Sequence, residues 1–454
     1  LNRVIEKAIR GSAPAQINVP RDYWCQVIDI DLPPIVRLER QGGGADAIAK
    51  AADLLSKAKF PVILSGAGVV IGGAIEETKK LAEKLDAPVC SGYQHNDSFP
   101  GSHPLAVGPL GYNGSKAAME LISKADVVLA LGTRLNPFST LPGYGIDYWP
   151  KKASIIQVDM NPDRIGLTKK VTVGISGDAK LVATQILEKL SSNAGDTDRQ
   201  KRKDLIHQTK SAWLQKLSSL DHEDDDEGTV WNKEARERDK DRMSPRQAWR
   251  AIQAGMPEDV IISSDIGNNC AIGNAYPTFE KPRKYLAPGL FGPCGYGFPS
   301  ILGAKIGCPN TPVIGFAGDG AFGISMNEMS SCAREEWPAI SMVIFRNYQW
   351  GAEKRNTTLW FDNNFVGTEL DPELSYAKVA NACGLKGVTV KTMEETTQAI
   401  KKSCEDQKKG ITTFIEVILN QELGEPFRRD AMKKPVRVAG INKKDMKPQK
   451  ALNG

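Results

Sequence analysis

The sequence predicts an α/β protein with two doubly wound parallel-sheet domains, joined by a polar linker and preceded by the remnant of a third domain. Strand-length apolar runs alternate with segments of helical period over most of the 454 residues, which is typical of parallel sheets. A stretch rich in both charges interrupts this alternation once. With 41% hydrophobic and 25% charged residues, the composition is that of an ordinary globular protein.

The first residues, LNRVIEKAIRGSAPAQINVPRDYW, have the pattern of a helix, a glycine turn and a strand. A proline-rich connector, IDLPPIVRLER, follows them. Residues 1–42 are therefore expected to be the end of a domain whose front is missing, together with a connector.

Residues 43–190 are expected to form the first complete α/β domain. The predicted strands lie within 61–68, 87–92, 126–134 and 154–162. Helical segments such as AIEETKKLAEKLD and SKAAMELISKA separate them. Residues 191–243 are polar and charged, which favours a solvated linker with some helix. The acidic run EDDDE at 223–227 has the groups to bind a cation, although such runs are usually only solvated.

Residues 244–421 are expected to form the second complete α/β domain. It opens with the helical stretch MSPRQAWRAIQAGM, which carries proline in its first turn. Its predicted strands are DVIISSDIG, TPVIGFAGDG, ISMVIFRN and ITTFIEVIL. Residues 422–454 form a basic tail that we expect to extend over the surface.

Composition argues against several classes of protein. The net charge of +5 is small for this length, so no nucleic-acid partner is expected. No apolar run is long enough to suggest a membrane span. Eight scattered cysteines without a CxxC pair argue against a zinc site or a redox dithiol, and predict reduced thiols in the cytoplasm. None of the four histidines has a neighbour at ligand spacing.

Two polar residues follow successive apolar runs of the second domain. Asp319 ends one predicted strand and Asn347 ends the next, and ligands bind at the carboxyl ends of strands in such sheets. A helix is expected from about Ala321–Phe322, with its free amides facing an anion. Gly318 and Gly320 permit close backbone approach and unusual dihedral angles. Carboxylate and amide oxygens suit Mg²⁺ on a diphosphate, although GDG alone equally fits a plain strand-to-helix turn.

The spacing between the two polar residues favours the diphosphate site over a plain turn. Twenty-six residues (321–346) separate Gly320 from Asn347. GDG-x26-N resembles the thiamine diphosphate motif of the acetolactate synthase and pyruvate decarboxylase superfamily. The resemblance implies an enzyme that uses thiamine diphosphate and Mg²⁺. It also implies that the side chains of Asp319 and Asn347, with the backbone carbonyl of Gln349, hold the metal.

Further segments carry the same resemblance. SSDIGNNC resembles a diphosphate-contacting segment of the family, which implies that Gly267, Asn268 and Asn269 bind the cofactor. GPCGYGFPSILGAKIG, which begins at Gly292, resembles the segment that holds the aminopyrimidine, with Cys294 where the family pattern has methionine. The first domain resembles the family's central domain, which holds a nucleotide in some members and is purely structural in many. We favour the structural role, and interpret Gly66 and Gly68 as a tight turn.

Within the superfamily, NYQWGAEKRNTTLWFDNNFVGTELD (347–371) is most similar to the sulfoacetaldehyde acetyltransferase branch. Such transferases convert sulfoacetaldehyde and phosphate to acetyl phosphate and sulfite, in the catabolism of taurine and other organosulfonates. An acyltransferase of this kind must bind a sulfonate and a phosphate. Lys354 and Arg355 are candidate anion ligands, with a solvated helix face as the alternative. For Arg428 and Arg429 a surface role is favoured, and for Trp350 and Trp360 core packing.

Several alternatives stay open. The chain could be an acetolactate synthase-like carboligase, a 2-keto-acid decarboxylase or an inactive cofactor-binding fragment. In this family the glutamate that activates the cofactor belongs to the pyrimidine-binding domain, which we expect to be largely missing, and no residue here replaces it. We therefore expect this chain alone to be inactive. Because the family's active sites form between subunits, a homodimer or homotetramer is expected.

Overall fold

The computed structural model describes residues 1–11, 13–32, 34, 38–194, 198–219, 237–289, 291–361 and 364–422. The acidic run at 223–227, the tail from residue 423 with Arg428 and Arg429, and the side chain of Trp360 lie outside the described residues.

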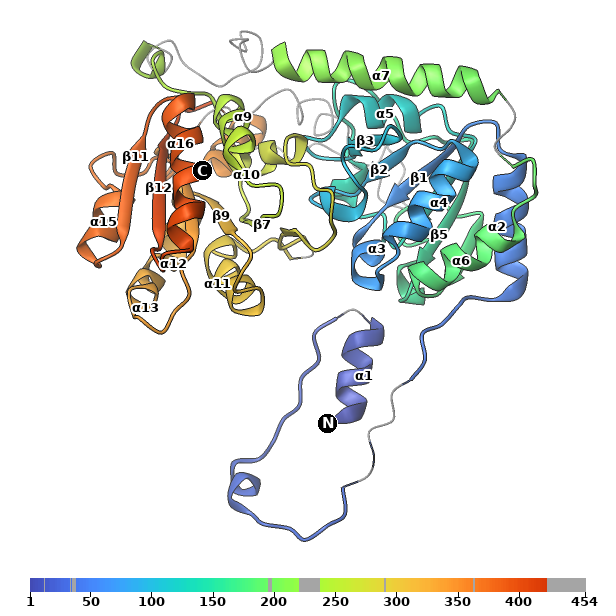
Figure 1. Ribbon diagram of the computed structural model, residues 1–454, viewed down its shortest axis with the longest axis horizontal. Coiled ribbons are helices and arrows are strands. Elements are labelled where there is room, and N and C mark those ends of the chain that lie inside the picture. Colours follow the sequence, from blue (N-terminus) through green and yellow to red (C-terminus); the bar gives the residue numbers. More distant parts are fainter. Residues whose placement is uncertain are drawn as a thin grey trace, which may run out of the picture.

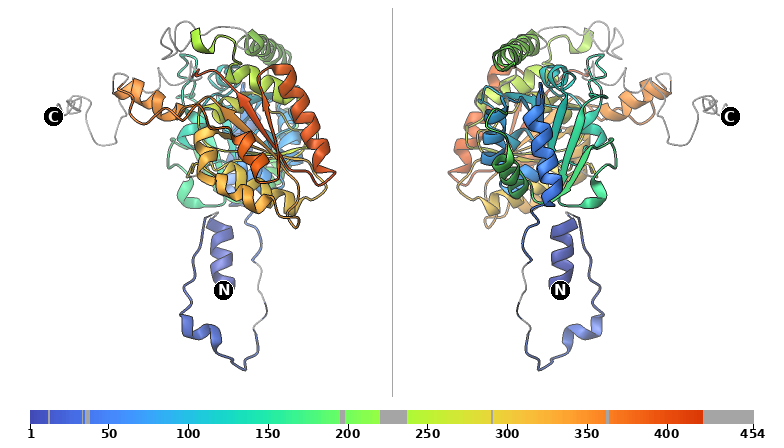
Figure 2. Two further views of the ribbon diagram at one scale, coloured as in Figure 1. Left: turned by 90° about the vertical axis from the view of Figure 1, so that its left-hand side faces the viewer. Right: turned by 90° about the vertical axis from the view of Figure 1, so that its right-hand side faces the viewer.

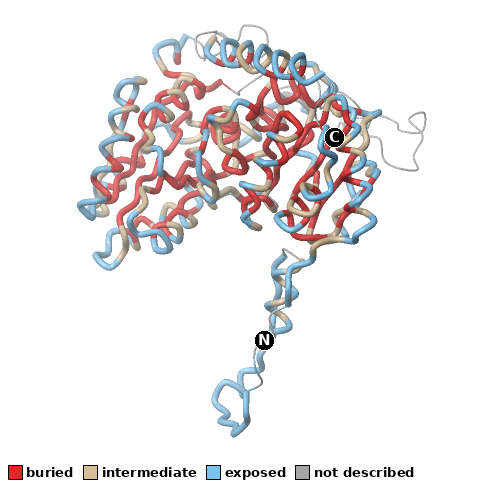
Figure 3. The backbone as a smooth tube through the Cα atoms, turned by 45° about the vertical axis from the view of Figure 1, so that its right-hand side comes forward, coloured by how far each residue is buried: buried red, intermediate tan, exposed pale blue. Residues whose placement is uncertain are grey.

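Two six-stranded sheets, parallel throughout, form the frame of the molecule, which confirms the predicted fold class (Figure 1). The first has the strand order β3-β2-β1-β4-β5-β6, and the second β11-β12-β10-β9-β7-β8. In the first sheet the strands after β1 are added on one side up to β3 and then on the other side from β4 to β6. The connections on either side of β1 and β4 therefore run in opposite directions, which creates the crevice where such sheets bind ligands. Buried residues, red in Figure 3, run through the interior of the molecule, and they include most residues of the central strands.

The first unit contains the strands β1 to β6. Their bounds are β1 Pro61–Ser65, β2 Val89–Ser91, β3 Ala106–Pro109, β4 Val127–Leu131, β5 Ser154–Asp159 and β6 Val173–Ser176. The helices that cover them are α2 Ala45–Lys57, α3 Ala67–Gly72, α4 Ile75–Leu85, α5 Lys116–Ile122 and α6 Ala179–Lys189. All residues of β1 and β4 are buried, as expected for central strands of a parallel sheet with both faces covered. The Asp178 side chain begins α6 by accepting hydrogen bonds from the backbone N–H groups of Lys180 and Leu181.

The second unit contains the strands β7 to β12. Their bounds are β7 Ile261–Ser264, β8 Tyr285–Leu286, β9 Val313–Gly318, β10 Ser341–Arg346, β11 Lys386–Val390 and β12 Thr413–Ile418. Its helices are α9 Pro245–Gly255, α10 Asn268–Ile272, α11 Gly297–Gly307, α12 Asp319–Ser325, α13 Met329–Cys332, α14 Gly351–Trp360, α15 Tyr376–Ala382 and α16 Met393–Gln407. Ser244 and Gln247 form a reciprocal capping box at the start of α9, which explains why this helix begins at Pro245.

The segment expected to be a solvated linker contains the long helix α7, Arg199–Ser219, which lies across the top of the molecule (Figure 1). Ile206 packs into the core of the first unit, whereas Trp213 and Leu217 pack into that of the second. Arg202 is buried and donates to the backbone carbonyls of Lys59, Leu85 and Asp86. The segment thus contains some helix, as expected, but one face of α7 is buried against both units, and the sequence reasoning did not anticipate this packing.

The N-terminal residues form an arm that projects from the two units (Figure 2). It contains the helix α1, Asn2–Gly11, and a short 3₁₀ turn, Arg21–Cys25. The strand expected before Tyr23 is wrong for this structure, since the described residues of 1–42 include no strand. A strand needs a neighbour for its backbone hydrogen bonds, and no strand among the described residues pairs with this segment.

Candidate functional site

Asp319 and Asn347 lie at the carboxyl ends of two adjacent parallel strands. The register between β9 and β10 pairs Gly318 with Phe345, so Asp319 directly follows one member of this last pair and Asn347 comes two residues after the other. Both side chains are buried, with 1% and 2% exposure. Helix α12 begins at Asp319 itself, two residues before the predicted start.

The Asp319 carboxylate is held against the residues around Asn347. Its Oδ2 accepts a 2.7 Å hydrogen bond from the Tyr348 backbone N–H and a 3.1 Å bond from Nη1 of Arg346. Its Oδ1 accepts from the Gly320 backbone N–H at 2.9 Å. Burial raises the pKa of Asp319 to about 6, although Arg346 and the two N–H groups oppose this shift.

Arg346 is a site residue that the sequence reasoning missed. Its guanidinium is 1% exposed, pairs with Asp319, and lies 3.8 Å from a carboxylate oxygen of Glu416 on β12. It also stacks over the rings of Tyr348 and Tyr376, at 4.2 and 5.4 Å from the ring centroids. An arginine that ends the apolar run of β10, directly before Asn347, was the available signal. Arg346 thus links two buried carboxylates.

The oxygen atoms near Asp319 fit a hard cation. Oδ1 of Asn347 is buried and has no hydrogen-bond partner among the described residues. The Gln349 side chain instead donates to the Gln421 carbonyl at 3.0 Å, so its amide nitrogen is already engaged. No three His, Cys, Asp or Glu side chains converge within the described parts of the chain. The predicted magnesium ligands would not form such a group, because they include only one carboxylate.

The glycines and apolar residues of this turn have specific roles. Neither Gly318 nor Gly320 has a positive φ, so the expected unusual dihedral angles are wrong. Gly320 is instead required by close approach, because a Cβ there would lie 2.8 Å from the Trp350 ring. Ala321 is buried, and the Phe322 ring packs in the core against Phe298, Tyr376 and Phe414. The Phe322 side chain therefore packs in the core, and only its backbone could contact a ligand.

Asp265, which the sequence reasoning did not single out, shapes the loop that contains Cys294. Its buried carboxylate accepts hydrogen bonds from the backbone N–H groups of Gly297 at 2.7 Å and Gly295 at 3.1 Å. Burial raises the pKa of Asp265, and these N–H groups oppose the shift. Gly292 and Gly295 both have positive φ, of 70° and 87°. Cys294 lies between them and is exposed.

The two residues after Gly267 lie in the interior beside Arg355. Gly267 has a φ of 131°, which side-chain-bearing residues rarely adopt, and α10 starts directly after it. Asn268 Oδ1 lies 3.4 Å from Nη1 of Arg355, which is 1% exposed. Asn269 Oδ1 is buried without a partner among the described residues. Lys354 points elsewhere and pairs with Glu369. Arg355 therefore reaches the predicted cofactor segment, whereas Lys354 pairs with Glu369.

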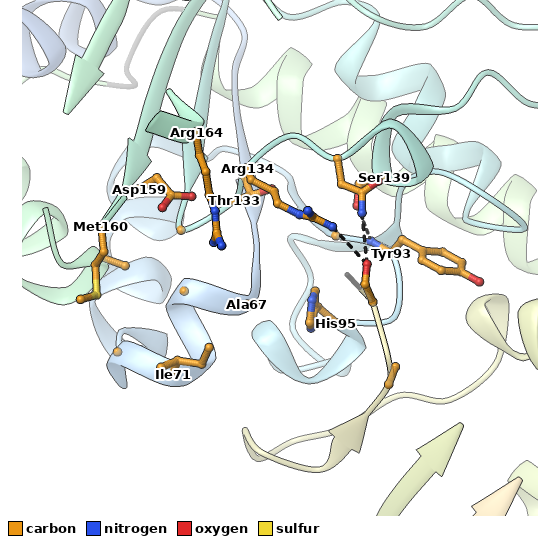
Figure 4. Close-up of a pocket in the computed structure, with 18 of the residues that line it drawn as sticks. Ala67, Ile71, Tyr93, His95, Thr133, Arg134, Ser139, Asp159, Met160 and Arg164 are labelled. Carbon is orange, nitrogen blue, oxygen red and sulfur yellow. Dashed lines mark hydrogen bonds between the residues drawn. The ribbon is translucent and has the colours of Figure 1, made fainter. Parts of the chain in front are cut away.

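A separate pocket of roughly 580 Å³ lies between the first unit and the 287–296 segment of the second (Figure 4). Arg134 and Arg164 point into it, and Asn136 joins Arg134 in donating to the Gly289 carbonyl. Gly66 and Gly68 lie where the backbones of α3 and Gly132 meet. A Cβ on Gly68 would lie 2.7 Å from the Gly132 Cα, so close packing accounts for both glycines.

His95 lines this pocket and supports a prediction on stability. Burial, aided by the charge of Arg134, lowers the pKa of His95 to about 4. Between pH 6.5 and 4 the unfolded chain gains a proton on this side chain that the folded chain does not. The free energy of unfolding is therefore expected to decrease as the pH is lowered through this window, by at most about 1.4 kcal/mol per pH unit.

Urea denaturation of wild type and His95→Gln between pH 4 and 7.5 measures this contribution. The difference between their unfolding free energies should change across the window, because glutamine does not titrate. A constant difference would contradict the prediction.

Two family models match the chain. The thiamine pyrophosphate enzyme central domain matches residues 48–186, and the C-terminal TPP binding domain matches residues 265–417. A protein of Rhizobium meliloti (strain 1021), called probable sulfoacetaldehyde acetyltransferase, is 78% identical over 452 residues, which cover 100% of this chain and 76% of the relative. The chain belongs to the thiamine pyrophosphate enzyme family. The recognised resemblance is thus confirmed.

Other relatives extend the comparison. The sulfoacetaldehyde acetyltransferase of Roseovarius nubinhibens is 72% identical over 99% of this chain and 74% of the relative. A probable acetolactate synthase large subunit of Methanococcus aeolicus is only 30% identical, over 86% of this chain and 65% of the relative. The sequence is therefore much more similar to the acetyltransferases than to the synthase.

Proposed function

We propose that this protein is a thiamine diphosphate- and Mg²⁺-dependent sulfoacetaldehyde acetyltransferase, which converts sulfoacetaldehyde and phosphate to acetyl phosphate and sulfite. The observation that carries the proposal is the identity of 67–78% over at least 99% of the chain to three proteins with that name, one of them called probable. The acetolactate synthase relatives reach only 28–30%.

Asp319, Asn347 and the Gln349 carbonyl are the proposed magnesium ligands. The buried, unpartnered Oδ1 of Asn347 supports this assignment, since an amide oxygen without a donor suits a hard cation. Among the described residues, Oδ1 of Asp319 accepts a hydrogen bond from the adjacent Gly320 N–H alone, whereas Oδ2 accepts from Arg346 and Tyr348. The remaining proposed cofactor contacts come from three segments: Gly267, Asn268 and Asn269; Gly292 and Cys294; and the backbone of Gly318, Gly320, Ala321 and Phe322.

Bound thiamine diphosphate supplies a nucleophilic carbon and an electron sink. The residues of this chain would hold the cofactor and orient the substrate beside it. Asp265 fixes the loop that carries Cys294, and the Trp350 ring covers Gly320. Arg355 is the favoured ligand for a substrate oxyanion, because its fork of donors suits sulfonate and phosphate oxygens. Lys354 is the second candidate, which would first have to leave Glu369.

The proposed setting is a cytoplasmic homodimer or homotetramer. All eight cysteines are unpaired, which fits a reducing compartment. Among the described helices, none has the length and apolar character to cross a bilayer. The exposed apolar side chains of Ile5, Ile9 and Trp24 on the arm are consistent with contact to further protein.

The decisive experiment is product analysis on the full-length protein with Mg²⁺ and thiamine diphosphate. Sulfoacetaldehyde and phosphate should yield sulfite and acetyl phosphate in equal amounts, whereas pyruvate should yield neither acetolactate nor carbon dioxide. Acetolactate from pyruvate, with no sulfite from sulfoacetaldehyde, would instead identify a carboligase and overturn the proposal.

A further inference from the structure

We propose that Tyr112, a residue of the first unit, is a positioning residue for the cofactor and anion site of the second unit. Its hydroxyl group holds Asn268 and Arg355 in place from the opposite side of the interface between the units. The proposal rests on the proposed function and gives the central domain a part in the site, beyond that of a scaffold.

The backbone around Tyr112 is rigidly held. Tyr112 follows β3, the edge strand of the first sheet that lies beside the second unit (Figure 1). Its backbone N–H donates to the Phe138 carbonyl at 3.0 Å, and its carbonyl accepts from the Asn274 side chain at 3.1 Å. The preceding Gly111 has a φ of 80°, and a Cβ there would collide with the Phe138 carbonyl. The turn therefore aims this side chain across the interface.

The Tyr112 hydroxyl group joins two residues of the second unit. It donates to Asn268 Oδ1 at 3.3 Å and accepts a hydrogen bond from Nη1 of Arg355. The Arg355 guanidinium lies 5.8 Å from the centroid of the tyrosine ring. Arg355 itself lies within 3.4 Å of Asn268 Oδ1. The three polar groups form a closed triangle in the interior.

This triangle orients the Asn268 amide for an anionic ligand. Both neighbours engage Oδ1, which leaves Nδ2 as a buried donor without a partner among the described residues. A buried N–H donor without an acceptor is costly, and a phosphate oxygen would satisfy it. Tyr112 thus favours the amide orientation that suits a diphosphate or a substrate oxyanion.

The test measures thiamine diphosphate affinity by calorimetry in the full-length protein with saturating Mg²⁺. Tyr112→Phe keeps the ring and removes the hydroxyl group, so its dissociation constant should rise about 3- to 12-fold, the equivalent of one net hydrogen bond. Tyr148→Phe is the matched control, because it removes a buried hydroxyl group of the first unit that bonds neither Asn268 nor Arg355. Its dissociation constant should stay within twofold of wild type.

A second measurement separates positioning from general stability. Arg355→Lys and the double variant Tyr112→Phe/Arg355→Lys should bind the cofactor about equally, because the triangle is already broken in either. Effects that multiply in the double variant would overturn the proposal, as would a Tyr112→Phe affinity within twofold of wild type. Should Tyr112→Phe melt well below wild type, Arg355→Lys alone decides, with weakened affinity expected and unchanged affinity contradicting the proposal.

Failure of the substrate assignment is distinguishable from failure of this inference. A protein that binds thiamine diphosphate with the predicted Tyr112 dependence, yet releases no sulfite, would overturn only the substrate. A wild-type protein with no affinity for thiamine diphosphate would overturn both.

Discussion

Asp319→Ala is expected to abolish turnover of the full-length protein, because the protein loses its only predicted carboxylate ligand to Mg²⁺. The affinity for Mg²⁺ with thiamine diphosphate should fall by about 100-fold or more, since the charge-assisted ligand is removed from a buried site. Calorimetric titration of the apo-protein measures this loss directly. Saturating cofactor and Mg²⁺ should restore activity only in part.

The control for this variant is Asp53→Ala, which removes an exposed aspartate from an ion pair on α2. Its cofactor affinity should equal that of wild type. Normal affinity in Asp319→Ala, with the fold intact, would exclude Asp319 as a metal ligand and remove the basis of the magnesium site.

Arg346→Met is expected to destabilise the apo-protein by about 3–5 kcal/mol, which is the usual cost of leaving a buried charge without its partner. Asp319 and Glu416 would both lose their counter-charge in a region where each is at most 2% exposed. Ser375, Thr389 and the Tyr376 backbone still bond Glu416, but they carry no charge. Urea denaturation without cofactor measures the change in unfolding free energy.

The double variant Arg346→Met/Glu416→Gln provides the internal check. It removes one of the two uncompensated carboxylates, so it should recover part of the lost stability. A double variant less stable than Arg346→Met alone would show that the bonds to Glu416 matter more than its charge. A loss below 1 kcal/mol in Arg346→Met would contradict the charge-bridging role itself.

The regular patterns of the sequence predicted most of the sheet framework. The long apolar runs correctly predicted β1, β4, β5, β9, β10 and β12, because a parallel strand covered on both faces needs apolar side chains throughout. The strands β3, β6, β8 and β11 were missed. They are short or contain glycine, and their strand geometry depends on pairing with a neighbour already in place.

The sequence by itself determined that Asp319 and Asn347 would end adjacent strands, since both follow apolar runs and glycine marks the turn. Only the tertiary structure decided which side chains accompany them. Lys354 and Arg355 are neighbours in sequence, yet successive helical residues project about 100° apart, so one meets Glu369 and the other Asn268. Arg346 lies at the site because β10 is next to β9 and β12, and Tyr112 reaches it from the other unit. Contacts between residues so far apart in sequence leave no local pattern in the chain.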